Sequence, residues 1–169
     1  MHRCEKMMRI THVVFSFGLI ALAAAWLGLG IAAALLAALW LAVIVNYVID
    51  AAGHEMRNGR RRRTAATHSL TGATALGAAV GFAPTLAIII AAPGAVSVYY
   101  GPLLLLEMTA LGVVAGLSHL LLDALTEGGI YYRGRRWALA HWRYDNGAAN
   151  GLFALLGILM LAAALMTVM

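Results

Sequence analysis

Residues 31–50 read IAAALLAALWLAVIVNYVID, an apolar run that carries no charged residue before Asp50. An α-helix needs about 20 such residues to cross a hydrocarbon core about 30 Å thick. Four further apolar runs occur along the chain, at Thr11–Leu29, His68–Ala92, Pro102–Ala124 and Asn150–Val168. The sequence therefore predicts an all-α fold, a polytopic membrane helix bundle of about five transmembrane helices.

The composition supports this fold class. Hydrophobic residues make up 63% of the 169 residues and charged residues only 11%, with a mean hydropathy of +0.85. A water-soluble domain could not bury so large an apolar fraction. Because five spans use most of the chain, we expect residues 1–169 to form a single integral membrane domain. The single cysteine, Cys4, excludes a disulfide within the chain.

The basic residues predict the orientation. All twelve lysines and arginines lie before Thr11, between residues 51 and 67, or between residues 125 and 149. If the five spans alternate, these three segments share one face, and the positive-inside rule makes that face cytoplasmic. We therefore expect a multi-pass protein of the inner or plasma membrane with a cytoplasmic amino terminus. Its arginines would lie near anionic lipid headgroups, and nucleic-acid binding is not expected because no aromatic platform accompanies Arg60–Arg63.

The histidines and most acidic residues gather on the same face. On this topology, residues from different helices fall at one membrane depth: His12, Asp50, His54, His68, His119, Asp123, His141 and Asp145. A helix bundle can bring such side chains together. Ionisable groups at membrane depth are costly and are commonly functional. The sequence therefore predicts a polar cluster at the cytoplasmic end of the bundle.

The spacing of these residues indicates a metal site. His119 and Asp123 are four residues apart, which puts imidazole and carboxylate on one helical face. Asp50 and His54 repeat the arrangement if the second helix continues through Gly53, although a frayed helix end is an equal alternative. Imidazole and carboxylate together suit Zn²⁺, with Mn²⁺ or Fe²⁺ as alternatives. We expect a site for one or more divalent ions, with ligands His12, Asp50, His54, His68, His119 and Asp123.

The stretch Ser118–Gly129, SHLLLDALTEGG, contains the pattern S-H-x-x-x-D-x-x-T-x-x-G. Together with Thr67-His68-Ser69 and the early Thr11-His12, it resembles the YdjM-like family of predicted membrane-bound metal-dependent hydrolases. That family is distantly similar to the zinc-dependent phospholipase C and P1 nuclease group. The resemblance covers most of the chain and implies a reaction class rather than a substrate.

Two departures from the family pattern bear on the ligand set. The family usually has D-x-D-H where this chain reads Asp50-Ala51-Ala52-Gly53-His54, and it has a His-Arg pair before T-H-S where this chain has Arg62-Arg63. His141 or Glu55 is therefore a candidate for the missing ligand.

The resemblance implies a membrane enzyme that hydrolyses an ester with metal-activated water. The expected substrate is a phosphoester, either a lipid or a small phosphorylated molecule. Asp50, Asp123 or Glu55 would take the proton, and Arg63 or Arg143 would stabilise the developing phosphate charge.

Two other functions stay open at this point. A noncatalytic membrane scaffold or regulator would use the small residues for helix packing and partner association, and a homo-oligomer is compatible with that composition. A metal or proton transporter would place polar residues near the bilayer midplane, where these spans are nearly all apolar.

Overall fold

The computed structural model describes residues 8–57, 59–92, 94 and 100–167. Within these residues the chain forms five long helices: α1 (Arg9–Trp26), α2 (Ile31–Ala52), α3 (Leu70–Ala91), α4 (Tyr100–Ala124) and α5 (Gly147–Thr167). Each helix is long and apolar enough to cross a membrane. The expected all-α bundle is confirmed, and every helix boundary lies within three residues of its expected position.

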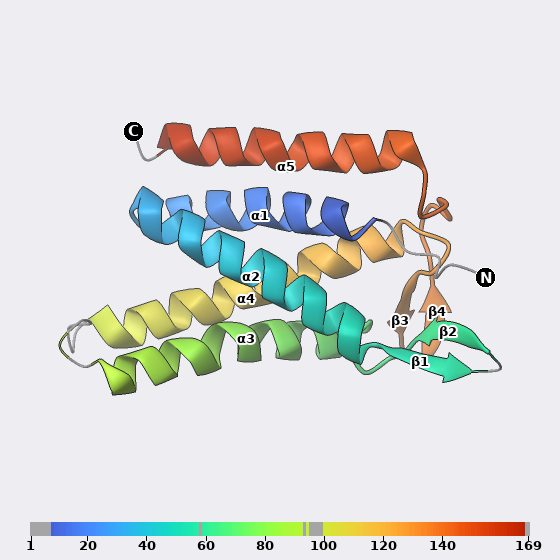
Figure 1. Ribbon diagram of the computed structural model, residues 1–169, viewed down its shortest axis with the longest axis horizontal. Coiled ribbons are helices and arrows are strands. Elements are labelled where there is room, and N and C mark those ends of the chain that lie inside the picture. The colour runs from blue at the N-terminus through green and yellow to red at the C-terminus, as the bar shows by residue number, and fades with distance from the viewer. Residues whose placement is uncertain (1–7, 58, 93, 95–99, 168–169) are drawn as a thin grey trace.

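The two long segments that were expected as loops each contain a short antiparallel hairpin. Strand β1 (His54–Arg57) pairs with β2 (Arg60–Arg63), and β3 (Ile130–Tyr132) pairs with β4 (Arg135–Trp137). Both hairpins lie at the end of the bundle where α1 begins, whereas the carboxyl end lies at the opposite end (Figure 1). The segments that carry arginine therefore share one end of the molecule, as alternation of five spans predicts.

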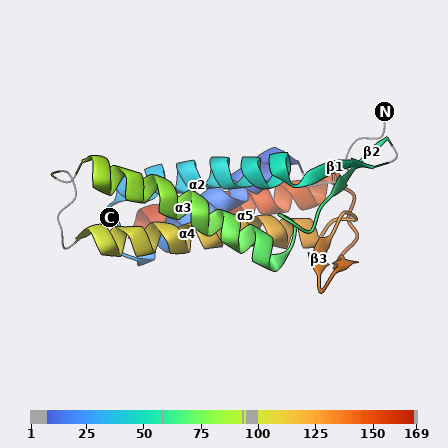
Figure 2. The same cartoon turned by 90° about the horizontal axis from the view of Figure 1, so that it is seen from below.

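Helices α1, α2 and α4 form the middle of the bundle, with α5 packed on α1 and α3 packed on α4 (Figures 1 and 2). The buried face of α2 carries residues of different sizes, including Ala38, Leu41, Val45 and Ile49, each with no exposed surface. Many large apolar side chains on the outer faces are exposed. Outward apolar surface of this extent is what lipid contact requires.

Helices α3 and α4 approach each other at glycines. A Cβ atom on Gly77 would overlap the carbonyl oxygen of Gly112, and one on Gly81 would overlap that of Met108. Gly77 and Gly81 are four residues apart, as are Gly112 and Gly116, which is the small-residue spacing that lets membrane helices pack closely. The α3–α4 interface therefore depends on the absence of side chains at these positions.

Replacing Gly112 with Leu should destabilise the bundle because the new side chain meets the backbone of α3. Overpacking a tight interface costs about 1–3 kcal/mol, and the overlap here is with backbone, so we expect a loss of at least about 2 kcal/mol. The matched control is Gly151→Leu, because a side chain at Gly151 on α5 meets no atom within 4 Å. Denaturant unfolding in detergent measures both; equal stability of the two variants would contradict this account of the interface.

Candidate metal centre

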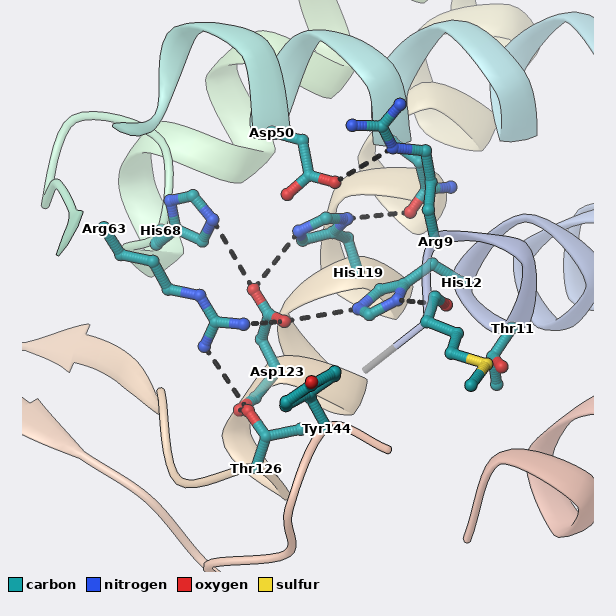
Figure 3. Close-up of polar contacts among 12 residues, drawn as sticks. Arg9, Thr11, His12, Asp50, Arg63, His68, His119, Asp123, Thr126 and Tyr144 are labelled. Carbon is teal, nitrogen blue, oxygen red and sulfur yellow. Dashed lines mark hydrogen bonds and ion pairs between the residues drawn. The ribbon is translucent and has the colours of Figure 1, made fainter. Parts of the chain in front are cut away.

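A cluster of imidazoles and carboxylates occupies the hairpin end of the bundle (Figure 3). Each member comes from the end of an element or from a segment joining two of them. His12 lies near the start of α1, Asp50 near the end of α2, His54 at the start of β1, His68 just before α3, and His119 and Asp123 near the end of α4. The predicted polar cluster is therefore present, and all six expected ligands belong to it.

The first ligand group is His12, His119 and Asp123, all buried, with ligand atoms within 4.8 Å of one another. His12 Nε2 lies 3.3 Å from Asp123 Oδ1, and His119 Nε2 lies 3.2 Å from Asp123 Oδ2. The i,i+4 spacing in α4 accounts for the second distance, as the sequence predicted.

The second ligand group is Asp50, His54 and His68, whose ligand atoms also lie within 4.8 Å of one another. The two groups are joined, because His68 Nε2 lies 3.5 Å from Asp123 Oδ2 and the His68 and His119 rings are 5.7 Å apart. Six potential ligands thus form one continuous cluster that can hold a metal ion.

All four imidazoles have Nδ1 beside an oxygen atom that can accept its proton; for His12 this atom is the Met8 carbonyl oxygen, at 3.4 Å. His54 Nδ1 is 2.7 Å from the carbonyl oxygen of Asp50, which can only accept, so this nitrogen donates. Thr67 Oγ1 donates its proton to the carbonyl of Ile49, so it must accept from His68 Nδ1 at 3.0 Å. His119 Nδ1 faces the Asn46 Oδ1 atom at 2.8 Å.

Protonation at Nδ1 leaves the Nε2 lone pair of each neutral imidazole available for a metal. Burial lowers the pKa of His68 to about 3, with the Arg63 charge adding to this and Asp123 opposing it. His68 is therefore neutral at physiological pH, and its Nε2 is in the form that ligates.

Within the part of the chain that the structure describes, three atoms at the centre of the cluster have no hydrogen-bond partner. These are His68 Nε2, His119 Nε2 and Asp123 Oδ2. Two nitrogen lone pairs that face a carboxylate oxygen repel it unless a cation lies among them. Bond lengths of about 2.0–2.1 Å on a tetrahedral zinc ion give ligand atoms about 3.3 Å apart. The separations of 3.2 and 3.5 Å from Asp123 Oδ2 fit such an ion.

Arg63 is the basic residue of the cluster, and the hairpin register places it there. In the β1–β2 pairing Arg63 lies opposite His54, so the two side chains share a face of the hairpin. Its guanidinium is buried, with one terminal nitrogen 2.6 Å from Asp123 Oδ1 and the other 2.8 Å from the Gly129 carbonyl. The Tyr131 hydroxyl donates to the Arg63 carbonyl and so holds the strand in place.

The second carboxylate has its own arginine. Arg9 Nε lies 3.5 Å from Asp50 Oδ2, and the Arg9 side chain is 53% exposed. His54, which donates to the Asp50 carbonyl, is half-buried. Arg9 and His54 therefore form a solvent-facing rim beside Asp50, whereas Asp50 and Asp123 are themselves buried, at 3% and 1% exposed.

Three residues expected at the site lie outside it. Glu55 follows His54 in a strand, where successive side chains point to opposite faces, and it is exposed. His141 is also exposed, because hydrogen bonds of the Trp142 backbone to residues 125 and 127 hold that segment with His141 outward. Arg143 is exposed and pairs with Asp145 at 3.1 Å. The structure thus places the ligand candidates Glu55 and His141 outside the cluster, and it does the same for Arg143, which was expected to stabilise the phosphate charge.

Sequence reasoning missed the residues that support the ligands. Asn46, Thr67 and Arg9 each contact a ligand residue; Thr67 had been noted only as part of the Thr67-His68-Ser69 motif, and Arg9 only among the basic residues before Thr11. The available signal was a polar side chain inside an apolar span, as at Asn46, because burial of an amide in a membrane requires a partner.

Comparisons with known proteins give a family but no activity. The model of a family described as "Protein of unknown function (DUF1286)" matches residues 7–122. The match spans more than half of the chain and includes all four histidines of the cluster. No curated protein and no solved structure matches the chain.

Removing Arg63 should destabilise the protein because the buried Asp123 carboxylate would lose its ion-pair partner. Breaking a buried ion pair by removing one partner costs about 3–5 kcal/mol, so we expect Arg63→Met to lose stability in this range in metal-free protein. Arg62→Met on the exposed side of the same strand is the control. The double variant Arg63→Met, Asp123→Asn should lose less than the sum of its parts. Denaturant unfolding with a chelator present measures these three variants and Asp123→Asn alone. Equal stability of the two single arginine variants would overturn the assignment.

Proposed function

The chain belongs to this DUF1286 family, and we propose that it is a membrane-bound, metal-dependent hydrolase that acts on a phosphoester. The observation that carries the proposal is the convergence of two imidazole Nε2 atoms on Asp123 Oδ2, with none of the three hydrogen-bonded. The resemblance of the Ser118–Gly129 motif to the YdjM-like hydrolases supports the same reaction class.

Zinc is the metal that we propose, with manganese and iron as alternatives. The ligand atoms are imidazole nitrogens and carboxylate oxygens, a mixture typical of zinc sites that keep an open position. The two groups supply three ligands each, enough for one or two ions. A bound ion of this kind supplies Lewis-acid activation of water, which suits hydrolysis.

The charges of the cluster support an anionic substrate. Asp50 and Asp123 are already balanced by Arg9 and Arg63. A divalent ion therefore brings uncompensated positive charge into a site of low dielectric, where it strongly favours an anion. A phosphoester carries that charge, and Arg9 at the rim is placed to meet it.

Within this proposal Asp50 is the proton acceptor. Asp123 is committed to Arg63 at 2.6 Å and to the imidazoles around it. Asp50 is itself 3% exposed, but it borders the Arg9 side chain, which is 53% exposed, and its ion pair with Arg9 is longer, at 3.5 Å. Arg63 positions Asp123 rather than binding the phosphate, because both of its terminal nitrogens already donate hydrogen bonds within the protein.

A noncatalytic scaffold with a structural metal site is the second candidate. Burial of the ligands favours it, since five of the six ligand residues are each at most 3% exposed: His12, Asp50, His68, His119 and Asp123. A structural site needs no substrate access, whereas a catalytic site needs the rim around Asp50 to admit substrate.

Metal content and hydrolysis together test the proposal. Protein purified in detergent should contain a stoichiometric transition metal by elemental mass spectrometry. His119→Ala and Asp123→Ala should lose this metal, whereas His141→Ala should keep it because His141 lies outside the cluster. Asp50→Asn keeps an oxygen ligand, so it should retain metal while hydrolysis falls by about 10²–10⁴-fold.

Hydrolysis is measured as release of the alcohol and the phosphomonoester from anionic phospholipid vesicles and from a soluble phosphodiester. Release from the vesicles alone indicates a lipid substrate, and release from both indicates a small-molecule active site. Metal that is equally retained in the His119→Ala variant would refute the metal site. Metal lost as expected but without hydrolysis of either substrate would favour the scaffold.

We propose that the cluster faces the cytoplasm, because the arginine-bearing segments share its end of the bundle. A fluorescent reporter that folds only in the cytoplasm should therefore be bright at the amino terminus and dark at the carboxyl terminus. A bright carboxyl-terminal fusion would contradict this orientation.

A further inference from the structure

A chain of four polar side chains runs from the cluster into the apolar part of the bundle. His119 contacts Asn46, Asn46 contacts Ser16, and Ser16 contacts Ser118, so α1, α2 and α4 are all connected. Ser16, Asn46 and Ser118 are each at most 2% exposed. Polar groups buried in membrane helices need partners, and here each one supplies the next.

The direction of every hydrogen bond in this chain follows from two backbone carbonyls. One side-chain atom of Asn46 lies 2.7 Å from the Ala42 carbonyl, which can only accept, so that atom is the amide nitrogen. The other atom is then the oxygen, and it faces His119 Nδ1 at 2.8 Å. His119 must therefore carry its proton on Nδ1.

Hydrogen bonds of Ser16 and Ser118 give the same orientation for the Asn46 side-chain amide. Ser118 donates to the Ala115 carbonyl at 2.8 Å, so its oxygen accepts from Ser16 at 2.6 Å. Ser16 in turn accepts from the Asn46 amide nitrogen at 3.1 Å. Reversing the amide would place its oxygen against the Ala42 carbonyl and would remove the donor that faces Ser16, so two contacts independent of His119 fix the orientation.

We propose that Asn46 is a positioning residue that holds His119 in the tautomer with Nε2 free for a metal. This inference rests on the proposed metal site and names the residue that prepares one of its ligands. Partners of the second imidazole nitrogen fix ring orientation and tautomer at metal sites, and their loss typically weakens metal binding by about 10–100-fold. The series of hydrogen bonds ends at the Ala115 carbonyl oxygen, which has no proton to pass on. The four side chains therefore orient a ligand and do not conduct protons.

The test reads the tautomer and the metal separately. Histidine-ring ¹⁵N NMR of the detergent-solubilised, metal-free protein reports which nitrogen of His119 is protonated, with the signal assigned by its loss in His119→Ala. The wild type should show the Nδ1-protonated form. Asn46→Leu removes the acceptor and should shift His119 toward the Nε2-protonated form. Zinc affinity of the same variant should fall by about 10–100-fold.

Two further variants separate positioning from helix packing. Ser118→Ala removes a hydroxyl from the same network but leaves the Asn46–His119 contact, so tautomer and zinc affinity should stay near wild type. Asn46→Asp keeps an oxygen acceptor and should keep the Nδ1-protonated form, which makes the test independent of whether Asn46→Leu folds. An unchanged tautomer in folded Asn46→Leu, or a changed one in Asn46→Asp, would overturn the proposal.

The outcome also distinguishes this inference from the proposed function. A wild-type protein that binds no zinc, together with a tautomer that changes in Asn46→Leu, would refute the metal enzyme and leave the positioning role of Asn46 standing. A zinc affinity that falls equally in Asn46→Leu and Ser118→Ala would assign the whole network to packing and overturn the positioning role.

Discussion

The contacts of the Asp123 carboxylate hold together the elements at the hairpin end of the bundle. Side chains from α1, β2, the segment before α3 and α4 itself all reach it, through His12, Arg63, His68 and His119. A buried charge of this kind is tolerated only when its partners are held at short range. The hairpin register, the start of α1 and the entry to α3 are therefore constrained together by one carboxylate.

The ionisable cluster lies at the hairpin end of the bundle, whereas the helices elsewhere pack through apolar contacts. Farther from the cluster, contacts between α3 and α4 such as that between Gly77 and Gly112 depend on close backbone packing. At the hairpin end the helices stop, and the connecting strands add polar groups without exposing backbone to lipid. A rim around Asp50 then meets solvent while Asp123 stays buried.

The sequence predicted the spans and the shared face of the histidines, because apolar run length and arginine distribution depend on local composition. The pairing of His119 with Asp123 followed from helical periodicity. The position of Arg63 did not, because it depends on the register of a hairpin that arginine-rich sequence does not indicate. Glu55 and His141 were alternative candidates for a ligand missing from the family pattern, and strand alternation and the Trp142 contacts turn them outward. Asn46 was missed because its role depends on which helix faces it.

X-ray absorption at the zinc edge of the purified, zinc-loaded protein tests the central claim most directly. The account predicts a shell of nitrogen and oxygen atoms at about 2.0–2.1 Å with the multiple scattering of coordinated imidazole. A sulfur neighbour at about 2.3 Å, or an oxygen-only shell without imidazole scattering, would contradict it, because either result would place the metal away from the histidines that converge on Asp123.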